Sequence, residues 1–291
     1  MKICYVANSR FPSERAHMTQ VVAMCNAFAQ NGHEVTLYVT DRKTHITEDP
    51  ESFFGVPFLF TLKRIAVPDI AGRAPRIPPL LRQPLFLIQR ITFAYRSYRA
   101  LRKENFELLY GRDEWILGLI SFFVRIPIIW ESHEAKFSRI ARILVKRVKR
   151  LVVISEGIRD YYLEHGVSAS LIHVAHDGVD ERFFAPPISK ELARERLGIT
   201  TEKPVVMYIG EFDAWKGVDT LFGAVGEGDS YVVYVIGGRN SDELARVREA
   251  YPAVVFLGPR PYKELPEHQQ AADILVLPNT GKNLLASAYT S

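Results

Sequence analysis

Cysteine is scarce in this chain of 291 residues, where only Cys4 and Cys25 occur, both inside apolar segments. Two such cysteines form neither a disulfide framework nor a cysteine-based metal site, which suits a reducing compartment. Long apolar runs are also missing. The longest stretch without a charge, residues 16–33, holds two Asn and two Gln and predicts an amphipathic helix rather than a membrane span. The opening MKICYVANSR has too short an apolar run for a secretory signal, so we expect a cytoplasmic protein.

Several common catalytic signatures are absent as well. The sequence contains no G-x-x-x-x-G-K-[ST] loop, no G-x-S-x-G turn, no H-E-x-x-H helix and no G-x-G-x-x-G after a predicted strand. These absences argue against P-loop nucleoside triphosphatases, serine hydrolases, zinc proteases and nicotinamide-dependent enzymes. Asp-x-Asp is also missing, so the usual carboxylate ligands for a metal-bound sugar nucleotide are not present. We expect no metal, no other cofactor and no nucleic-acid partner.

Charge is distributed unevenly along the chain. Residues 1–150 hold 24 Lys and Arg against 13 Asp and Glu, whereas residues 151–291 hold 13 against 20. Two segments, residues 73–103 and 136–150, are basic without any acidic residue, and the first is interleaved with apolar side chains. Such a segment suits contact with an anionic membrane or an acidic substrate. It also suits a solvated helix face whose apolar side packs on the core, and the residues alone leave both interpretations open.

Apolar runs typical of buried strands alternate with helical patterns along most of the chain. Residues 50–84, rich in proline and aromatic residues, have no clear assignment. Strands separated by helices predict a parallel sheet with helices on both faces. The predicted strands lie at residues 2–7, 31–39, 106–111, 126–130, 151–154, 171–175, 204–210, 231–238, 253–258 and 273–278.

The alternation breaks at FFAPPIS, residues 183–189, where two prolines disfavour helix and strand, and then restarts. We therefore predict an α/β protein with two Rossmann-like domains, residues 1–184 and 185–291. The second contains four predicted strands. A doubly wound domain usually has about five or six, so we expect the second domain to be incomplete.

Ligands of open α/β sheets bind beyond the carboxyl ends of the strands, so the loops at those ends form the candidate site. In the second half these loops read GEFDAWK, GGR, GPR and PNTGKN. Their glycines permit close backbone approach, and Lys216 can neutralise the charge of a phosphate. Four such loops in one domain favour a nucleotide ligand.

In the first half, the corresponding loops carry NSRFPSER, Arg112 with Asp113, and ESHE. His133 lies between two carboxylates of ESHE, which could raise its basicity or fix its tautomer. The alternative is a loop histidine with only local hydrogen bonds, and spacing alone favours that alternative. Ser155 could be a nucleophile, but its place before a helical pattern favours a helix N-cap.

Taken together, these segments resemble the retaining glycosyltransferases of family four, which have the GT-B architecture. The resemblance covers the whole chain and includes NGHEVTLYV and LVVISEGIRDYYLEHGVSASLIHVAHDGVDERFF. It is most specific in YIGEFDAWKGVDTL and VVFLGPRPYKELPEHQQAADILVLPN. It implies transfer of a sugar, with retention, from a nucleoside-diphosphate sugar to the hydroxyl of a glycan or lipid-linked acceptor. It also implies a role in cell-surface glycan or glycolipid synthesis. The basic segment of residues 73–103 separately suggests that the first domain sits on the inner face of an anionic membrane and meets a lipid-linked acceptor there.

The resemblance implies roles for individual residues. His133 and Lys216 are implied as catalytic, His133 near the donor sugar and the acceptor and Lys216 on the donor diphosphate. The implied nucleotide-sugar-binding residues are Gly210, Glu211, Lys216, Gly237, Gly238, Arg260, Pro278 and Asn279. The implied acceptor-side residues are Arg10, Ser13, Glu14, Arg15 and Arg112.

Three departures from the family pattern matter. Glu211 stands where most relatives have Arg, so its carboxylate should point away from the diphosphate or meet a sugar hydroxyl. Pro12 and Ser13 replace a Gly-Gly pair, which should stiffen that loop. The family's Glu-x₇-Glu motif, which contacts the donor sugar, is not found near the end of the chain, and this agrees with an incomplete second domain. Two alternatives therefore stay open, a nucleotide-sugar-binding fragment without catalytic activity and a GT-B-like sugar-nucleotide epimerase.

Overall fold

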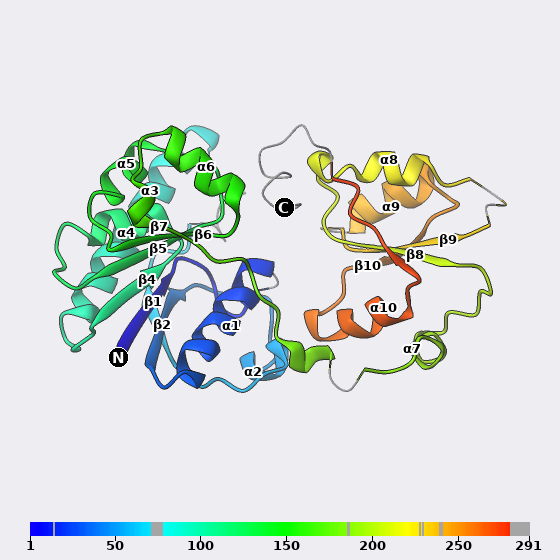
Figure 1. Cartoon of the computed structure of the whole chain (residues 1–291), viewed down its shortest axis with the longest axis horizontal. Coiled ribbons are helices and arrows are strands. Elements are labelled where there is room, and N and C mark those ends of the chain that lie inside the picture. The colour runs from blue at the N-terminus through cyan, green and yellow to red at the C-terminus, as the bar shows by residue number, and fades with distance from the viewer. Residues whose placement is uncertain are drawn as a thin grey trace. The chain divides into compact units, whose positions relative to one another are not determined.

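The structure, a computed structural model, describes residues 1–13, 15–70, 78–184, 187–226, 228, 230–238 and 241–279. Contacts divide the chain into two compact units, Met1–Gly178 and the residues from Val179 onward. Each unit is built on a parallel sheet, so the predicted α/β class is confirmed (Figure 1). The domain boundary predicted after residue 184 lies shortly beyond this division and stays a prediction.

The first unit contains a seven-stranded sheet of order β3-β2-β1-β4-β5-β6-β7. The order reverses between β1 and β4, so the carboxyl ends of these two strands flank the point where a ligand crevice is expected. The strands are β1 (Lys2–Ala7), β2 (Glu34–Asp41), β3 (Thr61–Ala66), β4 (Leu108–Gly111), β5 (Ile128–Ser132), β6 (Arg150–Val153) and β7 (Ile172–Val174).

Helices cover both faces of this sheet, α1 on one face and α3, α4 and α5 on the other (Figure 1). The apolar side chains of α1 recur three and four residues apart, at Met18, Val21, Val22 and Cys25, and this face packs on β1 and β2. The helices are α1 (Ala16–Gln30), α2 (Pro50–Phe54), α3 (Pro79–Leu101), α4 (Glu114–Ile120), α5 (Arg139–Leu144), α6 (Glu156–Glu164) and the short 3₁₀ helix η2 (Ala169–Leu171).

The second unit contains a four-stranded sheet of order β10-β9-β8-β11 within the described residues. One core lies between this sheet and α8 and α9, and a second lies between the sheet and α7 and α10. The strands are β8 (Val205–Ile209), β9 (Val232–Ile236), β10 (Val255–Gly258) and β11 (Ile274–Leu275). The helices are α7 (Lys190–Leu197), α8 (Val218–Gly223), α9 (Ser241–Ala250) and α10 (Leu265–Ala271), with 3₁₀ helices η3 (Glu181–Phe184), η4 (Ala214–Lys216) and η5 (Tyr262–Glu264).

All ten predicted strands are present. The sequence did not predict β3 and α2, which lie in the unassigned residues 50–84, nor α7. Of the helices in the described residues, none is long and apolar enough to cross a membrane.

Candidate functional site

A buried carboxylate, Glu131, organises the carboxyl edge of the first sheet. It lies near the end of β5 and is 3% exposed. The parallel register of β4 and β5 pairs Gly111 with Trp130 and so brings the end of β4 beside it. Oε2 of Glu131 accepts a hydrogen bond from the Tyr110 hydroxyl at 2.5 Å. Oε1 accepts one from Nε2 of His133 at 2.5 Å and lies 2.6 Å from Nη2 of Arg112.

Charge compensation explains why this carboxylate is tolerated in the interior. Burial by itself would raise the pKa of Glu131. Its pKa nevertheless lies below the ordinary value, because the effect of burial is outweighed by the His133 hydrogen bond, the charge of Arg112 and the Tyr110 hydroxyl. Burial, and then the charge of Glu131, raise the pKa of Tyr110. At neutral pH the network therefore contains an ionised Glu131, a charged Arg112 and a neutral Tyr110.

The second carboxylate beside His133 is not the one that the sequence predicts. Glu134, its neighbour in ESHE, is exposed. Instead Asp177, which follows β7, places Oδ2 3.7 Å from Nδ1 of His133. Gln20 of α1 donates a 3.1 Å hydrogen bond to the other oxygen of Asp177. His133 therefore joins a network drawn from β4, β5, β7 and α1, which a loop histidine with local bonds alone would not do.

Glu131, His133 and Asp177 each bring one possible ligand atom within 4.8 Å of the others. A cation could be considered there on geometry alone. The Arg112 guanidinium, however, already lies 2.6 Å from the Glu131 oxygen and supplies the compensating positive charge. We therefore assign no metal to these three residues.

The loop between β1 and α1 carries the other predicted acceptor-side residues. Ser13 is buried and its hydroxyl accepts a 3.4 Å hydrogen bond from the backbone of Arg15, while Arg10 is half-buried and Arg15 exposed. Glu14 lies outside the described residues. Within the first unit this loop follows β1, on the same sheet edge as Arg112 and His133, because parallel strands end together.

In the second unit, backbone hydrogen bonds join three glycine turns at the carboxyl edge of the sheet. The Gly210 amide donates to the Ile236 carbonyl at 2.9 Å, and the Gly237 amide donates to the Gly258 carbonyl at 3.1 Å. Gly237 has a φ of 141°, and a Cβ there would lie 1.8 Å from the Gly210 carbonyl oxygen. Only glycine fits this approach. Gly258, which begins the candidate loop GPR but is not among the individually implied binding residues, completes the row.

Lys216 ends η4 in the loop that follows β8. It is half-buried, and its ammonium lies 4.4 Å from the centroid of the Trp215 ring. The backbone amide of Lys216 donates to the Asp213 carbonyl at 2.8 Å, which holds the turn. This arrangement presents a cation on the same loop as Gly210.

The remaining predicted residues of the second unit lie at the ends of its strands. Glu211 is exposed, and its carbonyl accepts a 2.8 Å hydrogen bond from the Tyr208 hydroxyl. Gly238, with a φ of 92°, follows Gly237. Arg260 is exposed after β10, whereas Pro278 and Asn279 are half-buried after β11. Their roles in ligand binding stay predictions.

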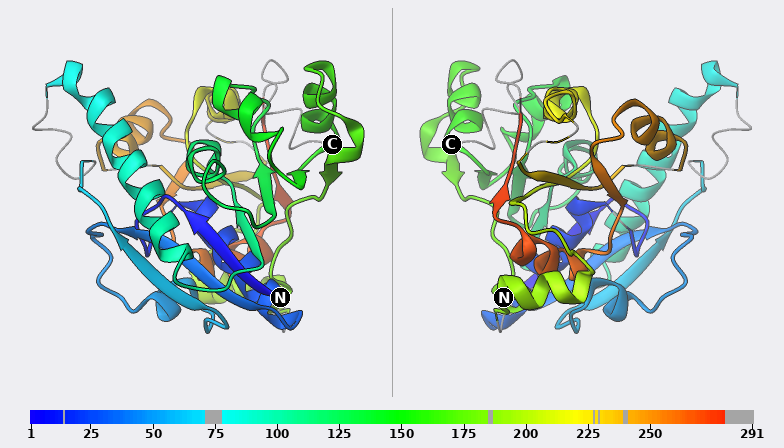
Figure 2. Two further views of the ribbon diagram at one scale, coloured as in Figure 1. Left: turned by 90° about the vertical axis from the view of Figure 1, so that its left-hand side faces the viewer. Right: turned by 90° about the vertical axis from the view of Figure 1, so that its right-hand side faces the viewer.

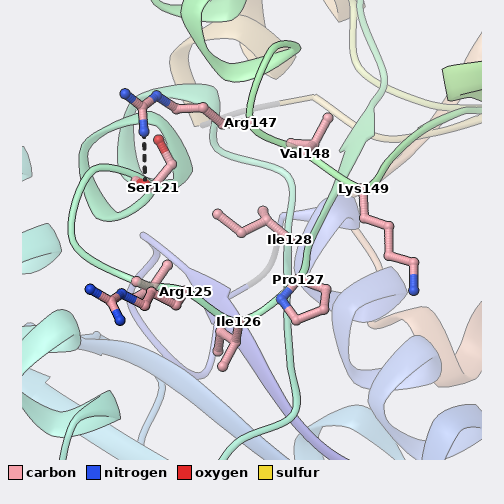
Figure 3. Close-up of a pocket in the computed structure, with 9 residues that line it drawn as sticks. Ser121, Arg125, Ile126, Pro127, Ile128, Arg147, Val148 and Lys149 are labelled. Carbon is pink, nitrogen blue, oxygen red and sulfur yellow. Dashed lines mark hydrogen bonds between the residues drawn. The ribbon is translucent and has the colours of Figure 1, made fainter.

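A pocket of about 420 Å³ lies at the opposite end of β5, beside Ile128. Arg125, Arg147 and Lys149 line it (Figure 3). Their charged ends point away from one another, and Arg147 donates a hydrogen bond to the Ser121 carbonyl (Figure 3). The three cations therefore do not converge on one anion, and we assign this pocket no ligand.

Comparison with known proteins decides the family. The family model described as Glycosyltransferase Family 4 matches residues 19–183, more than half of the chain. The chain belongs to glycosyltransferase family 4. A second family model, Glycosyl transferases group 1, matches residues 189–283.

The chain spans about half or less of the length of the curated relatives it matches. The D-inositol 3-phosphate glycosyltransferase of Corynebacterium aurimucosum is 30% identical over 203 residues, which are 57% of this chain and 48% of that protein. That the second domain is incomplete stays a prediction.

Solved structures resemble this family 4 chain across nearly its whole length. Anabaena Alr3699/HepE in complex with UDP and glucose matches with a TM-score of 0.68 and 16% identity, over 94% of this chain and 73% of that one. The UDP-GlcNAc 2-epimerase of Neisseria meningitidis matches with a TM-score of 0.61 and 11% identity, over 94% and 76%. At these sequence identities the structural likeness establishes only the fold, so the expected GT-B fold is confirmed. The likeness does not distinguish a transferase from an epimerase, because both are among the similar structures.

Proposed function

We propose that the protein transfers a sugar from a nucleoside-diphosphate sugar to an acceptor hydroxyl with retention of configuration. The observation that carries this proposal is the row of glycine turns in the second unit, at Gly210, Gly237 and Gly258, on the sheet edge that also bears Lys216. Close backbone approach and a nearby cation suit a diphosphate. Membership of family 4 and the UDP-bound state of a structural neighbour support the same donor class.

We assign the chemistry to two sets of groups. Negative charge grows on the leaving diphosphate in the transition state, and Lys216 with nearby backbone amides stabilises it. His133, oriented by Glu131, positions the donor sugar and the acceptor hydroxyl. Because lysine and amides carry the leaving-group charge, the proposal includes no metal or other cofactor.

Incubation of the full chain with UDP-, GDP- and ADP-sugars and a mixture of glycan acceptors tests this proposal. The anomeric configuration of the product, read by NMR, tests retention. The proposal predicts sugar on an acceptor, with turnover reduced at least about tenfold by Lys216→Ala, which is about 1.4 kcal/mol. Sugar that stays on the nucleotide with an inverted carbon favours the epimerase alternative. Nucleotide binding without turnover favours the binding fragment.

We also propose that the first unit docks on the inner, cytoplasmic face of an anionic membrane. There the enzyme would serve cell-surface glycan or glycolipid synthesis. The support is the surface of α3, which projects beyond the sheet on which it packs (Figure 2). The helix has basic residues and no acidic ones. Basic, apolar helices bind such membranes. Its exposed apolar residues, here called the α3 face, are Leu80, Leu81, Leu87, Ile88, Ile91 and Tyr95.

A further inference from the structure

The two ring nitrogens of His133 have different surroundings. Nε2 is hydrogen-bonded at 2.5 Å to the carboxylate of Glu131, which is buried. Nδ1 lies 3.7 Å from Oδ2 of Asp177, and this distance is longer than a hydrogen bond. Among the residues that the structure describes, Nδ1 has no hydrogen-bond partner. The nitrogen of His133 that is open to a ligand is therefore Nδ1.

The carboxylate of Asp177 is fixed from its other side. Gln20 of α1 donates a 3.1 Å hydrogen bond to Oδ1, which leaves Oδ2 facing the His133 ring. The side chains of His133 and Asp177 are 22% and 41% exposed, whereas that of Glu131 is 4% exposed. A ligand from solution therefore reaches Nδ1 and Oδ2 but not the Glu131 carboxylate.

Both of the atoms open to a ligand accept hydrogen bonds. Glu131 is ionised and only accepts, so Nε2 of His133 carries the proton of their shared hydrogen bond. In the neutral ring Nδ1 then carries a lone pair, as Oδ2 of Asp177 does. Two acceptors side by side suit a ligand that supplies two donors.

Neighbouring hydroxyl groups of a sugar ring supply such a pair of donors. Their oxygens lie slightly closer together than the 3.7 Å between Nδ1 and Oδ2, so two nearly parallel hydrogen bonds of about 2.8 Å fit. We propose that His133 and Asp177 together bind two neighbouring hydroxyls of a substrate sugar. This inference rests on the proposed transferase function, in which His133 positions the substrates, and adds Asp177 as a specificity-determining residue. Glu131 acts through His133 and does not touch the sugar.

Substrate analogues that each lack one hydroxyl test this pair in the full chain. They are monodeoxy forms of the nucleotide sugar and of the acceptor that the parent turns over, and the series that responds identifies the sugar bound. The parent should use two analogues, modified at neighbouring ring carbons, at least about tenfold less well than the complete sugar. Asp177→Ala should lower kcat/KM for the complete sugar about tenfold, mainly through KM, and should lose the discrimination against one of the two analogues.

The matched control is Glu134→Ala, which removes an exposed carboxylate next to His133. It should change kcat/KM less than about twofold and keep the discrimination against both analogues. If Asp177 has only a structural role, Asp177→Ala will unfold at a lower temperature yet discriminate as the parent does. Discrimination that is unchanged in Asp177→Ala, or equal effects of the two variants, overturns the proposal.

A spectroscopic measurement separates this proposal from the transfer reaction. The nitrogen NMR resonance of Nδ1, assigned by comparison with His133→Gln, reports hydrogen bonding to that atom. It should shift with UDP-, GDP- or ADP-sugars or with acceptor glycans, and not with UDP, GDP or ADP alone, and the shift should shrink in Asp177→Ala. A shift without turnover removes the transferase proposal and leaves the hydroxyl site standing. Absence of the shift overturns the hydroxyl site, whether or not the protein turns over substrate.

Discussion

Removing the charge of Glu131 leaves Arg112 buried without its counter-ion, and such a loss destabilises a protein strongly. We predict that Glu131→Gln lowers the free energy of unfolding by about 3–5 kcal/mol. Urea unfolding of the full chain measures this change. Glu134→Gln, at an exposed position two residues beyond β5, is the matched control and should stay within about 0.5 kcal/mol of the parent. Equal stability of the two variants would show that the network contributes little.

The same carboxylate predicts a pH dependence. The pKa of Glu131 is lower in the folded protein than in the unfolded chain. Its contribution to stability is therefore complete above the ordinary glutamate pKa, about 4.3, and is lost as pH falls through the lower folded value. We predict that the stability difference between the parent and Glu131→Gln is constant near pH 7 and shrinks below about pH 4.3. A difference that grows on acidification would contradict the assignment.

The structural role of a single residue could be predicted from the sequence where that role depends only on residues close to it in sequence. Ser155 is confirmed as the N-cap of α6, because its hydroxyl accepts the Ile158 amide at 3.3 Å. Asp177 could not be assigned to His133, because only the folding of β7 beside β6 brings it near. Gly237 was identified from its place after a strand, but the contact that requires glycine involves Gly210, from another loop.

At the scale of elements, the glycine row fixes how the loops after β8 and β9 meet. A Cβ at Gly237 would collide with the Gly210 carbonyl, and its φ of 141° is strained for other residues. We predict that Gly237→Ala destabilises the second unit by roughly 1–3 kcal/mol, measured by thermal unfolding. Gly223→Ala, in α8 with no atom near the added methyl, should be neutral or stabilising by up to about 1 kcal/mol. A well-tolerated Gly237→Ala would refute the close approach.

The α3 face gives a second prediction for an element. Ile91→Glu places a negative charge on a basic, apolar surface, so it should reduce co-sedimentation with anionic vesicles at least about threefold. Leu59→Glu makes the same change at an equally exposed residue outside α3 and should have little effect. If the parent protein binds vesicles equally well with and without anionic lipid and at low and high salt, the membrane proposal is contradicted.

Elements were predictable from the sequence where burial makes the pattern uniform. The ten predicted strands are mostly short apolar runs in parallel sheets. Strand β1 has the predicted bounds, and α1 lies within the helical stretch predicted over residues 16–33. Strand β3 was missed because it lies at the sheet edge and contains Lys63 and Arg64. Lys63 is accommodated through a 2.6 Å ion pair with Glu104 and its position over the Tyr38 ring. These partners are distant in sequence, so local pattern does not reveal them.

At the scale of the whole molecule, two successive alternations of strand and helix predicted two Rossmann-like domains. The GT-B fold was implied by the resemblance to family four, and the family comparison confirms the membership. Chemistry is harder to predict at this scale, since the same fold is found in an epimerase. Donor binding by the second unit is therefore the central claim, because the transferase proposal depends on it.

Isothermal titration of the full chain with UDP, GDP and ADP, without added metal, tests that claim most directly. The account predicts saturable binding of one of the three. Lys216→Ala should weaken it at least about tenfold. Lys203→Ala, which removes an exposed lysine before β8, should leave it unchanged. No binding of any nucleotide, or equal losses in the two lysine variants, would contradict a diphosphate site at the glycine row.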